Sequence, residues 1–325
     1  MAAQYVAKRR QNLYKQHVTY MHHVAWGIVC ILLLAVVLGL LTQAQTLSNN
    51  NSDLRRQLAA AKMPSTTCRV TGQWQANTTK QLAISAPSGS RDYFVHTPKD
   101  FADTKYYPLL MFYPGRGASA QAAEAAYKLD ALPAVVVYPT PTMGAGGMLA
   151  WQGAPYSSGS DDIGFTTAIL DKTMSDLCID RTKVYAAGMS NGGGFTSLLS
   201  CKLSSRFAAY AIVSGALYYP NGDCTPPRPS PLISIHGDQD QTVPYDGSVF
   251  RKLPPVDDWI AARAAKNGCN NPPTTTYSNG DAVATVWNNC KNGASVENVR
   301  IEGGIHAWGQ IPNEQIWQFL SRFSL

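Results

Sequence analysis

Residues 65–325 of this chain carry no net charge, since they hold 20 basic and 20 acidic side chains. The formal charge of +6 comes from residues 1–64, which contain seven Lys or Arg and a single acid, Asp53. Proteins that bind nucleic acids do so through clustered, uncompensated Lys and Arg. The main part of the chain lacks this feature, so no nucleic-acid partner is expected.

Metal-binding cysteine patterns are also missing. The chain has no Cys-x-x-Cys pair and no Cys/His cluster with zinc spacing, so neither a metal nor another cofactor is predicted. Apart from Cys30, which lies in an apolar run, an even number of cysteines remains, as is typical of disulfides in an oxidising compartment. We expect Cys269 to pair with Cys290, because the segment between them is rich in Asn, Pro and Gly. The cysteines outside the apolar run are Cys68, Cys178, Cys201, Cys224, Cys269 and Cys290.

A long uncharged apolar run occurs once, at residues 24–41. At ~1.5 Å per helical residue it is about 27 Å long, close to the thickness of a bilayer core. We predict a basic cytoplasmic leader at 1–23 and a transmembrane signal anchor at 24–42, with the following chain outside the cytoplasm. The alternative is a secreted protein whose signal peptide is cleaved after 42–44. The length of the run and of the leader argue against cleavage.

Residues 43–64 are predicted to form a stalk or linker. Three leucines on a heptad-like spacing are too few to indicate a coiled coil. Pro64 and the hydroxyl residues after it mark the border of a folded domain. We therefore expect a single catalytic domain at 65–325.

Short β-branched or aromatic runs alternate with helix-like stretches throughout this domain. Near-continuous apolar strands separated by helices predict an α/β fold with a mostly parallel sheet covered on both faces. In such sheets the active groups gather at the carboxyl ends of the strands. The predicted strands are 91–98, 108–115, 134–139, 183–188, 208–215, 231–237 and 296–304, and the predicted helices are 161–177, 191–203, 256–266 and 313–323.

A Gly-x-Ser-x-Gly motif lies at one predicted strand-to-helix junction, Gly188-Met189-Ser190-Asn191-Gly192. Flanking side chains would collide with the strand and the helix in so tight a turn, so both outer positions require glycine. The turn exposes the serine hydroxyl beside the free backbone N–H groups of a helix start. Ser190 is therefore the candidate nucleophile, although the motif alone is not specific.

A serine nucleophile needs an adjacent base and an acid that orients the base. His306 follows the last predicted strand, and Asp238 and Asp240 follow the strand before it. The order Ser, Asp, His is that of α/β-hydrolases. The spacing leaves both aspartates open as the acid, and it makes His96 and His236 weaker candidates for the base because each lies within or beside a strand.

Three motifs in this order carry a family resemblance. Residues 178–216, the sequence H-G-D-Q-D-Q-T-V-P-Y at 236–245 and G-G-I-H-A-W at 303–308 resemble elements of feruloyl esterases and of the related polyhydroxybutyrate-depolymerase-like esterases. The resemblance covers residues 68–325 and implies the α/β-hydrolase fold and ester hydrolysis by a Ser-His-Asp triad. It assigns the acid to Asp240 and leaves Asp238 an accessory position.

The chain departs from the family at Pro114, where a histidine is common. An oxyanion hole needs one backbone N–H from this loop and one from the residue after the nucleophile. Backbone donors survive such an exchange, so we expect the N–H groups of Arg116 and Asn191 to form the hole. Gly117 is the alternative to Arg116.

The resemblance suggests hydroxycinnamoyl or acetyl esters of polysaccharides as substrates, with polyhydroxyalkanoate or other polyesters as the alternative. Trp151, Tyr245 and Trp308 are candidate residues of an acyl pocket, because aromatic rings offer apolar area near a polar reacting centre. Ordinary core packing is the alternative for Trp151. Acyl transfer to a sugar or lipid hydroxyl, and a non-catalytic membrane-tethered binding domain, are the other hypotheses. The sequence does not decide the oligomeric state.

Overall fold

A computed structural model describes part of the chain. The chain divides into two compact units, Met1–Lys62 and Met63–Leu325, and the elements named below all belong to the second. The predicted leader, membrane anchor and stalk lie outside the described residues, apart from Gly39 and Gln43. Within the described ranges, no helix is long and apolar enough to cross a bilayer. Those ranges are 39, 43, 68–86, 89–218, 224–270, 272–278 and 280–325.

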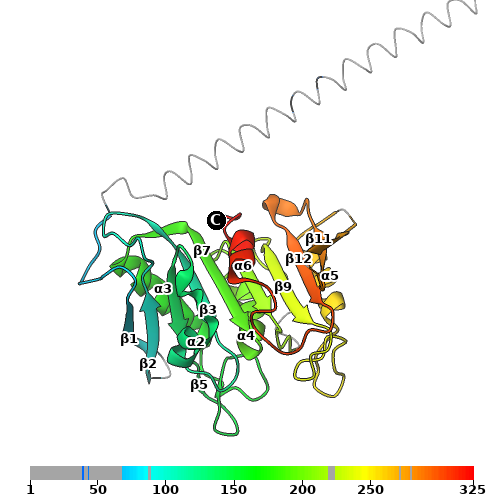
Figure 1. Ribbon diagram of the computed structural model, residues 1–325, viewed down its shortest axis with the longest axis horizontal. Coiled ribbons are helices and arrows are strands. Elements are labelled where there is room, and N and C mark those ends of the chain that lie inside the picture. The colour runs from blue at the N-terminus through cyan, green and yellow to red at the C-terminus, as the bar shows by residue number, and fades with distance from the viewer. Residues whose placement is uncertain are drawn as a thin grey trace, which may run out of the picture. The chain divides into compact units, whose positions relative to one another are not determined.

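A ten-stranded sheet forms the centre of the second unit (Figure 1). Its order is β1-β2-β4-β3-β7-β8-β9-β12-β11-β10, and the run from β4 to β12 pairs in parallel while the strands beyond it pair antiparallel. The predicted mostly parallel sheet is confirmed. The strands are β1 Thr79–Ala86, β2 Gly89–His96, β3 Tyr107–Tyr113, β4 Val135–Pro139, β7 Ile179–Met189, β8 Ala209–Val213, β9 Leu232–Gly237, β10 Thr274–Ser278, β11 Ala282–Trp287 and β12 Val296–Ile301, with a small hairpin of β5 Thr142–Met143 and β6 Leu149–Ala150.

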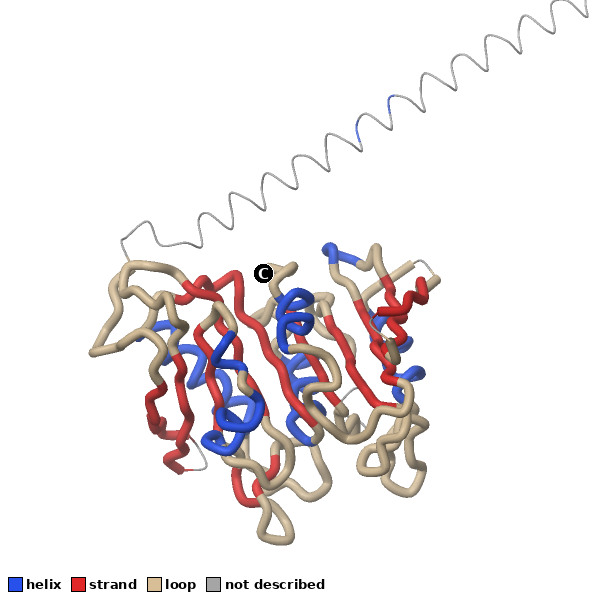
Figure 2. Tube along the Cα trace, in the orientation of Figure 1, coloured by secondary structure: helices blue, strands red, loops and turns tan. Residues whose placement is uncertain are grey.

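Helices cover both faces of this sheet (Figure 2). Alternate residues of β3 enter the two cores: Met111 packs on the side of α3, α4 and α5, and Phe112 packs on the side of α2 and α6. This period of two is what a strand buried on both faces requires. The helices are α2 Ala120–Tyr127, η1 Leu129–Ala131, α3 Asp162–Asp176, α4 Asn191–Lys202, α5 Val256–Lys266, η2 Lys291–Gly293 and α6 Asn313–Leu320.

Three disulfides hold the domain, and the predicted pair Cys269–Cys290 is confirmed. The other two pairs are Cys68–Cys178 and Cys201–Cys224. The Asn-, Pro- and Gly-rich segment inside the Cys269–Cys290 bridge is not a loop throughout. It contains β10 and β11, which extend the sheet beyond β12.

A buried ion pair joins β2 to the start of α3. Arg91 Nη1 lies 2.6 Å from Asp162 Oδ1, and the two side chains are 6% and 2% exposed. Arg91 also donates to the Thr140 carbonyl at 2.9 Å, and its guanidinium lies 3.7 Å from the centre of the Phe165 ring. Burial raises the pKa of Asp162 and lowers the pKa of Arg91, while the attraction between the two charges opposes both shifts.

The variant Asp162→Asn is expected to destabilise the fold by ~3–5 kcal/mol, because it leaves the Arg91 charge buried without a partner. Urea unfolding at neutral pH measures the change. The matched control is Glu302→Gln, which removes a carboxylate from the exposed Arg300–Glu302 pair and should cost about 1 kcal/mol or less. Equal losses in the two variants would contradict this assignment.

Candidate active site

The candidate nucleophile lies in a strained turn between β7 and α4. Ser190 has φ 55° and ψ −119°, a conformation that non-glycine residues rarely adopt. A Cβ on Gly188 would lie 2.4 Å from the Gly192 carbonyl oxygen, and a Cβ on Gly192 would lie 2.0 Å from the Tyr113 carbonyl oxygen. The steric reason predicted for these two glycines is therefore confirmed. The turn is kept by the close packing of β7, α4 and the end of β3.

Backbone hydrogen bonds fix Ser190 in this turn. Its N–H donates to the Val213 carbonyl at 2.9 Å, and its carbonyl accepts from Gly194 and Ala216 at 3.0 and 2.9 Å. The loop after β3 passes close by, since a Cβ on Gly115 would lie 3.4 Å from the Ser190 Cβ and 3.9 Å from its Oγ. Glycine at position 115 thus keeps space open in front of the half-buried hydroxyl.

The carboxylate that reaches His306 is that of Asp240. Asp240 Oδ2 lies 2.7 Å from His306 Nδ1, and Oδ1 accepts from the backbone N–H groups of Thr242 and Val243 at 2.8 and 2.7 Å. Burial raises the pKa of Asp240, but hydrogen bonds from His236, His306 and Val243 outweigh it, so the pKa lies well below its ordinary value. An ionised Asp240 keeps a proton on Nδ1 and leaves Nε2 of His306 free to accept one.

Ser190, Asp240 and His306 follow β7, β9 and β12. These strands belong to the parallel run β7-β8-β9-β12, so their carboxyl ends lie at one edge of the sheet. The Ser190 hydroxyl makes no hydrogen bond to His306 or to any other residue that the structure describes. Catalytic hydrogen bonds are often long without substrate and tighten in the complex. Asp238 lies on the same loop as Asp240, after β9. Its carboxylate accepts a hydrogen bond from the Gly303 N–H at 2.8 Å, so it holds the loop that carries His306.

The backbone N–H groups of Asn191 and Arg116 stay the predicted oxyanion donors. Asn191 is the first residue of α4, where helix geometry leaves the N–H without an intrahelical acceptor. The Arg116 N–H has no acceptor among the described residues, whereas the Gly117 N–H donates to the Leu149 carbonyl at 2.8 Å. Gly117, the alternative donor, is thus engaged elsewhere. The Arg116 side chain donates to the Ala145 carbonyl at 3.0 Å, which ties the loop after β3 to the β5–β6 hairpin.

Comparisons with known proteins agree with this architecture. Feruloyl esterase B of Piromyces equi is 30% identical over 256 residues, which cover 72% of this chain and 46% of that protein. The bifunctional acetylxylan esterase/xylanase XynS20E of Neocallimastix patriciarum is 26% identical over 239 residues, covering 72% and 34%. The structure of acetyl xylan esterase from Aspergillus awamori has a TM-score of 0.57 at 14% identity, covering 75% of this chain and 99% of that one, and shows a common fold.

The chain is therefore similar to feruloyl esterases over 72% of its length, and its fold is that of the α/β-hydrolases. No model of a known protein family matches it. The chain spans less than half the length of each of the two curated relatives above. The three motifs that carry the family resemblance form β7 with its turn, α4 and β8, then the loop after β9, then the loop after β12. They therefore supply the three strand ends at which Ser190, Asp240 and His306 lie.

Trp151 is a core residue in this esterase fold, which corrects its expected place in an acyl pocket. Its side chain is fully buried and stacks on Phe195 with the ring centres 5.1 Å apart. Its Nε1 donates to the Pro114 carbonyl at 2.9 Å, and its backbone N–H donates to the Asn191 side chain at 2.7 Å. With no surface to offer a substrate, Trp151 instead ties the loop after β3 to the nucleophile turn.

Tyr245 is also corrected, because it is 6% exposed and its hydroxyl is engaged. The hydroxyl donates to Asp257 Oδ1 at 2.6 Å and accepts from Asn298 Nδ2 at 2.8 Å. The side chain therefore belongs to a buried polar network between the loop after β9, α5 and β12, and it does not line an open pocket.

Trp308 is half-buried, so a substrate contact at this residue stays a prediction. Its ring packs edge-on against Phe112 and Tyr127, with ring centres 5.1 and 5.3 Å apart. Its Nε1 donates to Asn313 Oδ1 at 2.8 Å. These contacts fasten the loop that carries His306 to β3, α2 and the start of α6.

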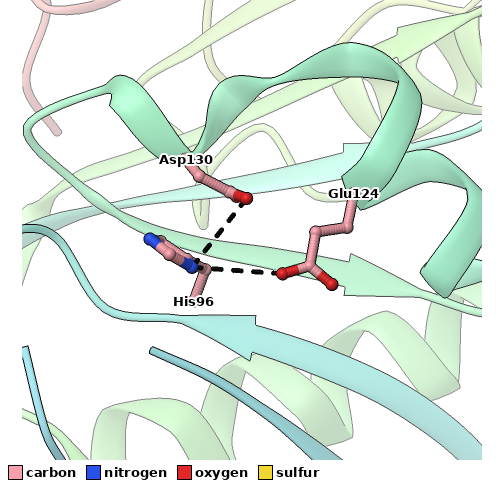
Figure 3. Close-up of side chains that lie close together, drawn as sticks. All are labelled: His96, Glu124 and Asp130. Atoms are coloured by element: carbon pink, nitrogen blue, oxygen red, sulfur yellow. Dashed lines mark ion pairs between the residues drawn. The ribbon is translucent and has the colours of Figure 1, made fainter. Parts of the chain in front are cut away.

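A second cluster of titratable side chains joins His96, Glu124 and Asp130 (Figure 3). His96 Nδ1 lies 4.0 Å from Glu124 Oε1 and 3.9 Å from Asp130 Oδ2. Among the described residues, these three are close enough together to hold a metal ion. The Thr79 hydroxyl bonds to both His96 and Glu124, and the Tyr138 hydroxyl donates to Asp130 at 2.7 Å. Hydroxyl donors thus already account for this arrangement, and we assign no metal to it.

His236 is the site residue whose place sequence analysis missed. The alternative to a weaker base, a hydrogen-bonded structural residue of a strand, is confirmed, because its Nε2 lies 2.8 Å from the Val243 carbonyl oxygen. The contact with the triad acid was not predicted: Nε2 also lies 3.2 Å from Asp240 Oδ2, the oxygen that lies 2.7 Å from His306 Nδ1. The signal was present in the sequence, because a histidine at the end of a strand and four residues before an aspartate can fold back on it. The spacing alone did not tell a base from a partner of the acid.

Proposed function

We propose that the chain is a serine esterase that hydrolyses carboxylic esters through an acyl-enzyme. The observation that carries the proposal is the Asp240–His306 hydrogen bond of 2.7 Å at the sheet edge where the Ser190 turn lies. A buried carboxylate, an oriented imidazole and a strained serine beside a helix start are the groups that such a reaction uses.

In the proposed reaction, Ser190 Oγ attacks the ester carbonyl carbon while His306 Nε2 takes the hydroxyl proton. The carbonyl electrons move to its oxygen, and the backbone N–H groups of Arg116 and Asn191 stabilise the oxyanion. Collapse of this intermediate expels the alcohol, which receives the proton from His306. Water then attacks the acyl-enzyme by the same route and releases the acid. Asp240 keeps the imidazole in the required tautomer throughout.

The proposed substrates are hydroxycinnamoyl or acetyl esters of polysaccharides. Support comes from the relatives, which are named feruloyl esterase and acetylxylan esterase. The two names differ in the acyl group, feruloyl in one and acetyl in the other, and the second name also gives xylan, a polysaccharide, as the carrier of the ester.

We also propose that the domain works outside the cytoplasm, anchored by residues 24–42. Support comes from three disulfides, which form and persist in oxidising compartments and are rare in the cytosol. The zero net charge of residues 65–325 fits a neutral ester substrate better than a polyanion.

The test combines turnover with labelling of the full chain. We expect release of ferulate from methyl ferulate or of acetate from a short acetyl ester, and covalent labelling by a fluorophosphonate at Ser190, located by peptide mass spectrometry. The variant Ser190→Ala should lose the label. If the protein neither hydrolyses these esters nor reacts with the phosphonate, the esterase proposal fails. Turnover with the label on another serine would replace Ser190 as the nucleophile.

A further inference from the structure

His236 shares the carboxylate of Asp240 with His306. His236 is the residue before the last in β9 and has no exposed surface. Its Nε2 lies 2.8 Å from the Val243 carbonyl oxygen and 3.2 Å from Asp240 Oδ2. The same Oδ2 lies 2.7 Å from His306 Nδ1, so two imidazoles converge on one oxygen.

The neighbours of His236 fix its tautomer. A carbonyl oxygen can only accept, so the contact with Val243 requires a hydrogen on Nε2. The other ring nitrogen, Nδ1, is buried and has no hydrogen-bond partner within the described part of the chain. A proton there would leave a positive ring with an unsatisfied N–H in a dry interior, which is costly. His236 is therefore a neutral ring whose single N–H points at Val243 and Asp240.

The ring is also held in place by its surroundings. Tyr245 packs against it edge-on, with ring centres 5.7 Å apart and planes at 82°. The Tyr245 hydroxyl is bonded to Asp257 and Asn298, so this neighbour is itself fixed. The His236 ring therefore keeps one orientation, with its N–H beside Asp240.

We propose that His236 is a positioning residue that holds the Asp240 carboxylate in the orientation His306 requires. The proposal rests on the esterase function proposed above. The backbone N–H groups of Thr242 and Val243 donate to Oδ1, and the His236 N–H, which donates to the Val243 carbonyl, also lies 3.2 Å from Oδ2. Rotation of the carboxylate away from His306 would disturb contacts at both oxygens. His236 does not touch the substrate and transfers no proton.

Three substitutions at this position separate positioning from packing. His236→Gln places an amide N–H near the position of Nε2, whereas His236→Asn places it near Nδ1 and His236→Leu fills the space without a donor. We expect kcat to stay within ~10-fold of the unmodified protein for the glutamine variant, and to fall roughly 100-fold for the other two, because a small misplacement of a catalytic group can cost this much.

The matched control is His96→Leu, which replaces the other buried strand histidine and should leave kcat unchanged. A packing role would instead make leucine equal to or better than glutamine, and that result would overturn the proposal.

Nuclear magnetic resonance provides a readout that does not depend on turnover. We expect the nitrogen shifts of His236 to show a neutral ring with hydrogen on Nε2. We also expect a low-field proton resonance from the His306–Asp240 hydrogen bond, which persists in His236→Gln and is lost or shifted in His236→Leu. A hydrogen on Nδ1 of His236, or a low-field resonance unchanged in the leucine variant, would overturn the proposal. If the unmodified protein hydrolyses no ester, the proposed function fails, and these spectra still decide whether His236 positions Asp240.

Discussion

Replacing Ser190 by alanine is expected to lower kcat for ester hydrolysis by about 10⁴- to 10⁶-fold. The variant removes the proposed nucleophilic oxygen, while the proposed oxyanion donors of Arg116 and Asn191 remain. The backbone conformation of position 190 is set by Gly188 and Gly192, so alanine should be accommodated in the same turn. KM should change much less than kcat, because the loss lies in the transition state.

The control for this experiment is Ser158→Ala, which removes an exposed hydroxyl from a loop serine and should leave kcat unchanged. The double variant Ser190→Ala with His306→Ala provides a second check. If the two residues act as one unit, the double variant loses about as much as either single variant. Additive losses would show that His306 acts independently of Ser190, and the proposed proton transfer would then be wrong.

The sheet, and the edge of it at which Ser190, Asp240 and His306 lie, could be predicted from sequence because their signals are local. Gly188 and Gly192 indicate a tight turn, because a Cβ at either position would lie only about 2 Å from a backbone oxygen. A parallel sheet follows from apolar strands alternating with helices, and the position of Ser190, Asp240 and His306 after strands then follows from chain order. The Cys269–Cys290 pair could be predicted because both cysteines flank one short segment.

The flanking strands were missed, although two of them, β10 and β11, carry a local signal. Residues 274–287 place an Asn-Gly dipeptide between two runs rich in Thr, Val and Tyr, and this pattern is a strong hairpin signal. Its high content of polar residues made it resemble a loop. β1 and α2 were also absent from the predicted elements, because Thr79–Ala86 and Ala120–Tyr127 are short and only weakly patterned. They take their structure from β2 and from the sheet face on which they pack.

The direction in which an aromatic side chain points could not be predicted. Tyr245 lies close in sequence to Asp240, and Trp151 follows a Gly-rich stretch, and either setting suits an acyl pocket or a core. The choice depends on partners remote in sequence: Trp151 finds Phe195 and the Pro114 carbonyl, and Tyr245 finds Asn298 on β12. Such contacts exist only once the sheet has assembled.

Replacing Asp240 by asparagine is expected to lower kcat by roughly 10³- to 10⁴-fold. The asparagine amide can turn its NH₂ group toward His306 Nδ1, which then has to accept a hydrogen bond and moves the imidazole hydrogen to Nε2. The base needed at Ser190 is lost while the shape of the site is kept. Initial rates of the purified variant, compared with those of Ser190→Ala, measure the effect. A loss below about 10-fold would exclude Asp240 as the acid of the triad.

The same variant should change the pH dependence of stability with a defined sign. Asp240 has a lower pKa in the folded protein than in the unfolded chain, where it is about 4. Its carboxylate therefore stabilises the fold fully above pH ~5, and this contribution is lost as the pH falls through the lowered folded-state pKa. Urea unfolding at pH 7 and at pH 3 should accordingly show a larger difference between the unmodified protein and Asp240→Asn at pH 7. A difference that stays constant or grows toward acid would mean that hydrogen bonds from His236, His306 and Val243 do not hold this group ionised.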